Sequence, residues 1–124
     1  MSVSSAQHAP GIGFRRGRRG RGVFALRRFR EAEIVETCPT VVLADEDVEG
    51  VVRNYVFSAR QPGKLLLVLG YGMLYNHSAE PNLFHRSAGR LLIEFVALRD
   101  IAAGEELTHD YGPGYWADRP IRPR

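Results

Sequence analysis

The sequence predicts a mostly β protein with one domain. From residue 23 onward, short apolar runs rich in β-branched and aromatic residues follow one another, and glycine, proline or acidic turns separate them. Neither an internal repeat nor an alternation of strands with helices that would build a parallel sheet is present. A chain of 124 residues has room for one core of ordinary size. These patterns do not separate a barrel, a sandwich and a less regular arrangement.

Residues 1–19 are predicted to form a flexible, basic N-terminal arm. Residues 1–10 are small and polar, and GIGFRRGRRGRG, residues 11–22, is so dense in glycine and arginine that we expect a loop. Residues 1–30 hold eight arginines and no acid, which leaves residues 31–124 with a net charge of −5 within a total of +3. Clustered arginines are typical of nucleic-acid contact, but Phe14 is the only aromatic residue among them and no recognised binding module surrounds them. From the sequence, direct nucleic-acid binding is therefore not expected.

Seven runs in the body are predicted to be strands. They are VFAL, EIVETCPTVVL, VVRNYVF, KLLLVLGY, NLFHR, LLIEFVAL and EELTHDY, which begin at residues 23, 33, 51, 64, 82, 91 and 105. The segment HRSAGR, residues 85–90, separates two of these runs and predicts a hairpin. The segment VEGVVRNYVF, residues 48–57, is the only helix candidate.

Several classes of protein are excluded by what the sequence lacks. Cys38 is the only cysteine, so an internal disulfide and a cysteine-rich zinc cluster are both excluded. His77 would have to share a metal with scattered residues such as His85 and His109, so no metal site is expected. The sequence has no apolar run long enough to span a membrane and no signal-peptide pattern. We expect a soluble, cytoplasmic protein, or one that reaches a host nucleus if its source is a pathogen or virus.

Two glycine- and asparagine-containing segments could contact a small polar ligand. Gly20 and Gly22 flank an arginine just before a strand, where the absence of Cβ atoms lets a ligand approach the main chain. The segment GYGMLYNHSAEPN, residues 70–82, interrupts an apolar run with Asn76 and Asn82, whose amides can donate and accept hydrogen bonds. Taken alone, these asparagines more often satisfy backbone groups at a crowded crossing than bind a ligand.

A third segment, RDIAAGEELTHDYGPGYW, covers residues 99–116. It ends a predicted strand at Tyr111, and Tyr115 and Trp116 follow a glycine turn. A tyrosine at the end of a strand usually packs its ring and leaves its hydroxyl in water, so this segment alone does not establish catalysis.

Together and in this order, GRGVFA, NYVF, GYGMLYNHSAEPN and RDIAAGEELTHDYGPGYW resemble the SET-domain family of protein lysine methyltransferases, most closely its small stand-alone viral and bacterial members. The resemblance covers residues 20–116 as a SET domain and leaves residues 117–124 as a C-terminal tail. It implies an irregular, β-clip-like fold of several short sheets. In that fold the C-terminal segment passes beside the Asn-His strand in a knot-like crossing.

The resemblance also implies a cofactor, S-adenosyl-L-methionine, and roles for individual residues. Tyr111 would be the catalytic tyrosine, and Tyr55 and Tyr111 would line the channel for the substrate lysine. The residues expected to contact the cofactor are Gly20, Arg21, Gly22, Tyr75, Asn76, His77 and Trp116. Trp116 is expected near the adenine, because the cysteine-rich zinc segment that closes the site in larger members is absent here.

The implied substrate is a protein with an accessible lysine, such as a histone tail or another basic protein. The acidic turn at residues 45–49 could attract such a peptide. A small domain without its usual lid is also expected to form a homodimer. The alternative function is a catalytically silent module that binds nucleic acid or a protein partner through the arginine-rich arm.

Overall fold

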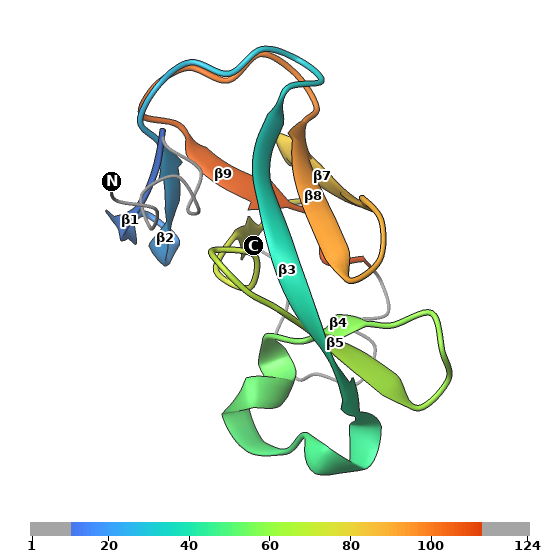
Figure 1. The fold of residues 1–124 in the computed structure, drawn as a ribbon. Helices are drawn as coiled ribbons and strands as arrows, with labels where there is room; N and C mark the ends of the chain where they lie inside the picture. Colours follow the sequence, from blue (N-terminus) through green and yellow to red (C-terminus); the bar gives the residue numbers. More distant parts are fainter. Residues whose placement is uncertain (1–10, 113–124) are drawn as a thin grey trace, which may run out of the picture.

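The structure is a computed structural model that describes residues 11–112 of the chain. Two sheets and two short 3-10 helices, η1 and η2, make up the described part (Figure 1). The strands are β1 (Ile12–Gly17), β2 (Gly20–Ala25), β3 (Ile34–Ala44), β4 (Phe57–Ser58), β5 (Lys64–Val68), β6 (Asn76–His77), β7 (Leu83–Ser87), β8 (Leu92–Ala97) and β9 (Glu106–His109). The predicted mostly β class with several short sheets is confirmed. None of the helices in the described region is long and apolar enough to cross a membrane.

The first sheet has the strand order β1-β2-β9-β6, and β1 and β2 form an antiparallel hairpin. The prediction of a loop at residues 11–22 is therefore wrong. The hairpin pairs Ile12 with Ala25 and Gly17 with Gly20, and the second strand buries Val23 and Phe24 in the protein. The arginine-rich first strand is an edge strand, where charged side chains are tolerated because they point into solvent. Pairing with a buried neighbour, rather than its own composition, makes this segment a strand.

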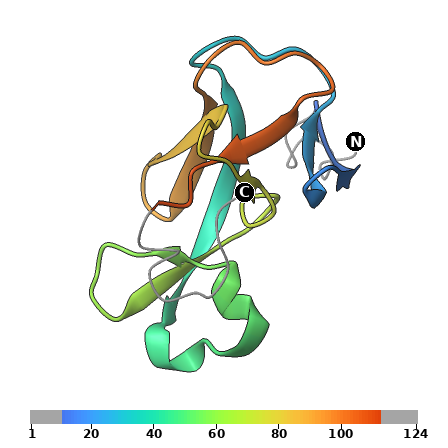
Figure 2. The same cartoon turned by 180° about the vertical axis from the view of Figure 1, so that it is seen from behind.

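The second sheet has the order β4-β5-β3-β8-β7, with β3 at its centre. Figure 1 and Figure 2 show the long β3 strand running alongside β8 in its first half and alongside β5 in its second half. Four of the predicted runs form β3, β5, β7 and β8, and the hairpin predicted at residues 85–90 joins β7 to β8. A bulge between Ile34 and Glu36 interrupts the register of β3 against β8. This bulge bears on the site, because Glu36 lies at it.

The helix candidate at residues 48–57 forms no α-helix. The helix η1 (Asp45–Asp47) precedes η2 (Gly50–Asn54), and β4 begins at Phe57. Gly50 has a positive φ of 72°, which lies outside the right-handed helical region and separates the two turns. Tyr55 follows directly after η2 and is 44% exposed.

The predicted crossing lies in the first sheet, where β6 pairs with β9. These strands are parallel, with Asn76 opposite Thr108 and His77 opposite His109. Asn82 holds β9 at this crossing through two hydrogen bonds. Its Nδ2 donates to the carbonyl oxygen of Glu106 at 2.8 Å, and its Oδ1 accepts from the Thr108 amide at 2.9 Å. Only 3% of Asn82 is exposed. The described part of the predicted crossing is thus this parallel pair and the asparagine that holds it.

Candidate active site

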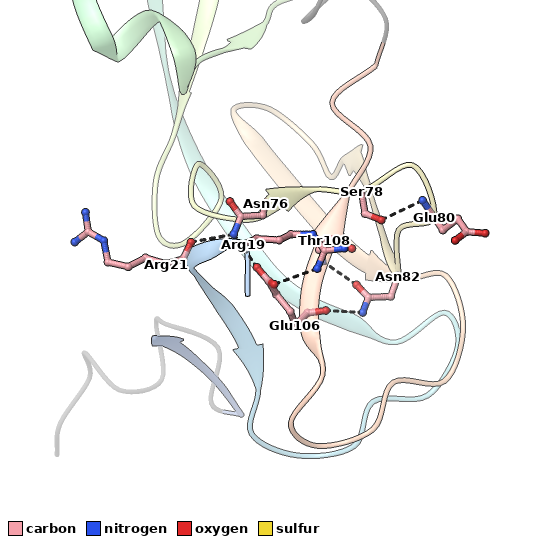
Figure 3. Close-up of polar contacts among 8 residues, drawn as sticks. All are labelled: Arg19, Arg21, Asn76, Ser78, Glu80, Asn82, Glu106 and Thr108. Atoms are coloured by element: carbon pink, nitrogen blue, oxygen red, sulfur yellow. Dashed lines mark hydrogen bonds and ion pairs between the residues drawn. The ribbon is translucent and has the colours of Figure 1, made fainter. Parts of the chain in front are cut away.

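A polar cluster forms where the β1–β2 hairpin meets β6 and β9. The side-chain amide of Asn76 (Nδ2) donates to the Arg21 carbonyl oxygen at 2.9 Å and to Glu106 Oε2 at 2.7 Å, as Figure 3 shows. The other oxygen of Glu106 forms an ion pair of 3.3 Å with Arg19. These bonds bring Arg21 and Asn76, two of the predicted cofactor residues, together from segments 55 positions apart.

Gly22 is required by the close packing of this cluster. A Cβ atom at Gly22 would overlap the Glu106 carboxylate and lie 2.8 Å from Asn76 Nδ2. Gly20 has a positive φ of 87° and no heavy atom within 4 Å of where its Cβ would be. The main chain at Gly20 is therefore open on one side, whereas at Gly22 it is in close contact with side chains. The open side at Gly20 suits a segment that presents its backbone to a ligand, whereas glycine at position 22 is required by packing.

A cavity of about 430 Å³ is lined in part by Tyr75, the residue that precedes Asn76 of this cluster. Tyr55, Tyr75 and Tyr111 line it, so the structure brings together the predicted channel residues with one predicted cofactor residue. The remaining lining residues are Asn54, Val56, Phe57, Ser58, Gly72, Met73, His85 and His109. The cavity thus has a mixed wall, in which apolar and aromatic groups surround a few polar ones.

Tyr111 is held at the edge of the cavity by both its side chain and its main chain. Its hydroxyl donates to the carbonyl oxygen of Tyr75 at 2.8 Å, and its amide donates to Nδ1 of His77 at 3.0 Å. Because the phenolic proton is directed at a carbonyl, the phenolic oxygen can act toward a further group only as an acceptor. An acceptor in this position can orient an amine that enters the cavity.

His77 is neutral in this arrangement. Its Nδ1 accepts from the Tyr111 amide, which requires the ring proton to be on Nε2. Burial lowers the pKa of His77, and although the Asp110 carboxylate 3.7 Å away acts in the opposite direction, burial has the larger effect. Asp110 is half exposed, so water screens its charge. The role of His77 seen here is to position the main chain of Tyr111.

Glu36 is part of this site, although the sequence analysis did not identify it. Its carboxylate is buried and accepts from the Tyr75 hydroxyl at 2.6 Å and from the Tyr71 amide at 2.8 Å. Burial and the charge of Glu36 raise the pKa of Tyr75 well above its usual value, so this phenol remains a donor. The Tyr75 carbonyl that receives Tyr111 is therefore anchored through its own side chain. The sequence signal that could have indicated Glu36 is an acidic residue within the otherwise apolar run EIVETCPTVVL.

Two histidines in the cavity wall were considered by the sequence analysis only as metal ligands. The His109 ring stacks on Phe57 at 5.7 Å between centroids and lies 5.0 Å from the Tyr111 ring. Burial lowers the pKa of His109 to about 3, and burial also lowers the pKa of His85. Both rings are therefore neutral near pH 7. Within residues 11–112, no group of three metal-ligating side chains comes together.

The remaining predicted features fall in different places. The acidic turn at residues 45–49 begins at η1 and directly precedes the helix that leads to Asn54 and Tyr55. One of its carboxylates, Asp45, forms an ion pair with Arg53. Trp116, predicted to cover the cofactor, lies outside the described residues.

Three comparisons with known proteins agree on the family. The family model of the SET domain matches residues 20–112. The chain is 33% identical over 105 residues to a histone-lysine N-methyltransferase of Schizosaccharomyces pombe specific for H3 lysine-37, a match that covers 80% of this chain and 71% of that protein. A crystal structure of a candidate histone methyltransferase of Plasmodium falciparum superimposes with a TM-score of 0.73 at 30% identity, covering 86% of this chain and 96% of that one.

A further similar structure is that of KRYPTONITE in complex with mCHH DNA, an H3(1-15) peptide and SAH. It aligns with a TM-score of 0.64 at 25% identity and covers 82% of this chain but 23% of KRYPTONITE. The extent of the family match and the identity to the yeast enzyme go beyond a shared fold. This chain therefore belongs to the SET-domain family of protein lysine methyltransferases.

Proposed function

We propose that the protein transfers a methyl group from S-adenosyl-L-methionine to the ε-amine of a lysine in a histone or another basic protein. The observation that carries the proposal is the position of Tyr111. Its hydroxyl donates to the Tyr75 carbonyl at 2.8 Å at the wall of the cavity. The next residue, Asn76, belongs to the polar cluster through its bond to Arg21. A lysine channel and a cofactor site would then share the segment from Tyr75 to His77.

The polar cluster has the chemistry that the amino-acid part of the cofactor requires. This part carries a carboxylate and an ammonium group, which need donors and acceptors respectively. The main chain at Gly20 is open on one side and can offer amide and carbonyl groups, and the Asn76 side chain lies against the neighbouring Arg21 carbonyl. At Gly22 a Cβ would collide with Asn76 and Glu106, so glycine there lets these polar side chains stand against the backbone of the segment. Gly20, Arg21, Gly22, Asn76, His77 and Tyr75 would thus hold the cofactor.

When bound, the cofactor supplies a methyl group on a sulfonium, which the lysine nitrogen takes by in-line displacement. The chain's task is to hold the nitrogen in line and at short distance, and such positioning can supply several kcal/mol of the barrier, on the order of 7–11 in favourable cases. The Tyr111 oxygen accepts a hydrogen bond from the amine and so directs its lone pair. The ring walls of Tyr55 and Phe57 exclude water from the alkyl part of the lysine side chain.

The lysine amine must also be neutral before it reacts. Its unperturbed pKa of about 10.4 would leave it charged at neutral pH. The apolar walls and the positive sulfonium both disfavour the ammonium form, and the neutral rings of His85 and His109 add no negative charge that would stabilise it. Because the cavity has no carboxylate among its lining residues, the ammonium proton would pass to solvent water before the transfer.

The acidic turn at residues 45–49 supports a basic substrate. It lies exposed beside the segment that supplies Asn54 and Tyr55 to the cavity, so a cationic peptide would be attracted toward the channel. The test is to incubate the purified protein with isotopically labelled cofactor and separate core histones, and to locate methylated lysines by mass spectrometry. Cofactor binding is measured in parallel by calorimetry. A folded protein that binds no cofactor and labels no histone would refute the proposal.

A further inference from the structure

The β1–β2 hairpin concentrates positive charge in an ordered arrangement. Arg16 and Arg21 occupy directly opposite positions of the two strands, and Arg18 and Arg19 form the turn between them. Like charges at opposed positions of an antiparallel pair destabilise it. The hairpin nonetheless carries five arginines within seven residues, a charge density that its own stability does not explain.

Most of these arginines have no acidic partner among residues 11–112. Arg19 pairs with Glu106, whereas the further acid pairs of the described region involve side chains outside the hairpin. The arginines that remain exposed without such a partner are Arg15, Arg16, Arg18 and Arg21. Their charge is therefore available to an external anion.

Two aromatic rings hold the guanidinium groups in place. Arg15 lies over the Phe24 ring at 3.9 Å from its centroid, and Arg21 lies 5.8 Å from the centroid of Phe14. A guanidinium that stacks on a ring keeps the N–H groups at its edge free to bind an oxyanion in bidentate geometry. The sequence indicated Phe14 as the only aromatic residue of the arginine cluster, and the structure adds Phe24 of β2.

We propose that the β1–β2 hairpin binds the phosphate backbone of double-stranded DNA. Duplex DNA carries one negative charge for about every 1.7 Å of its axis, a density that can neutralise several guanidinium groups on one short hairpin. All five basic residues are arginines, the side chain best suited to phosphate recognition. A protein partner would be expected to meet a larger apolar centre than the half-exposed Phe14 ring that this face offers.

The distribution of charge over the molecule supports binding of DNA at the hairpin rather than at the body. Residues 31–124 carry a net charge of −5, and the acidic turn at residues 45–49 lies at the opposite end of the described part from the hairpin (Figure 1). A polyanion is therefore repelled by the body and attracted by the hairpin. The inference goes beyond the proposed function and does not depend on methyl transfer.

The test measures binding of a short fluorescent DNA duplex by anisotropy over a range of salt concentrations. Each neutralised phosphate contributes about 0.9 to the slope of log K against log salt. Arg15 faces the other side of the hairpin from Arg16 and Arg21, so contacts by Arg16, Arg18 and Arg21 predict a slope of roughly −3. The double variant Arg16→Glu and Arg18→Glu should make the slope shallower by about 2 and weaken binding at low salt at least about tenfold. These two residues are exposed and are not among those proposed to hold the cofactor.

The matched control is the double variant Arg60→Glu and Arg90→Glu, which changes the net charge equally at exposed positions in two loops that join strands of the other sheet. It should bind DNA with the wild-type slope. Equal losses in both double variants, no binding by the wild type, or binding of polyglutamate or anionic vesicles as tight as that of DNA would each overturn the proposal. Cofactor affinity by calorimetry should be unchanged in both variants, so failure here is separate from failure of the proposed methyl transfer.

Discussion

Replacing Asn82 by alanine should destabilise the protein strongly, because this side chain satisfies two buried main-chain groups. The change removes the 2.8 Å bond to the Glu106 carbonyl oxygen and the 2.9 Å bond to the Thr108 amide. Both partners would stay buried and unpaired, at a cost of about 1–3 kcal/mol each. The expected loss in the free energy of unfolding is therefore roughly 2–6 kcal/mol. That is a large part of the total stability of a domain, which is about 5–15 kcal/mol.

The assay is equilibrium unfolding in urea, with the melting temperature measured alongside. A loss of about 3 kcal/mol corresponds to a fall in melting temperature of roughly 10 °C for a chain of this size. The control is Glu80→Ala, an exposed side chain in the same loop, which should change stability by no more than about 0.5 kcal/mol. A loss of less than about 1 kcal/mol for Asn82→Ala would show that this asparagine does not hold the crossing.

Three further predictions concern the site. Gly22→Ala should weaken cofactor binding at least about tenfold in calorimetry, because its Cβ would displace Asn76 and Glu106; wild-type affinity would exclude Gly22 from the cradle. Glu36→Gln should lower kcat, since an amide group would face one of two buried donors; an unchanged kcat would exclude a positioning role. Stability should fall as pH decreases from 6.5 toward 3, by up to about 1.4 kcal/mol per pH unit, because His109 is protonated more readily in the unfolded chain. His109→Phe should flatten this acid limb in urea titrations, and an unaltered limb would assign it to other groups.

The sequence predicted most of the second sheet because its strands have the expected composition. The runs that form β3, β5, β7 and β8 are apolar and β-branched, and a glycine turn joins the last two. The prediction was wrong for β1, because an arginine- and glycine-rich segment has no strand pattern of its own. That strand depends on pairing with the buried β2, which is a tertiary effect that local composition does not contain.

The residues of the candidate site were predicted from motifs, and Glu36, which lies between these motifs in the sequence, was not predicted. The sequence connected Asn76, Arg21 and Tyr111 only by resemblance, and the structure gives the hydrogen bonds that link their segments. Glu36 belongs to no such motif, and its role depends on a bulge that turns it inward between two tyrosines. Long-range contacts of this kind, here over 39 positions between Glu36 and Tyr75, are not contained in local patterns.

The central claim is that Tyr111 orients the reacting amine, and Tyr111→Phe tests it most directly. The substitution keeps the ring and the main-chain bond to His77 but removes the hydroxyl that bonds the Tyr75 carbonyl. The measurement is kcat for methyl transfer to a histone substrate, with cofactor affinity determined on the same samples. We expect kcat to fall at least about 100-fold, as for the loss of one preorganised group, while cofactor affinity changes little. A variant with wild-type kcat would contradict the account.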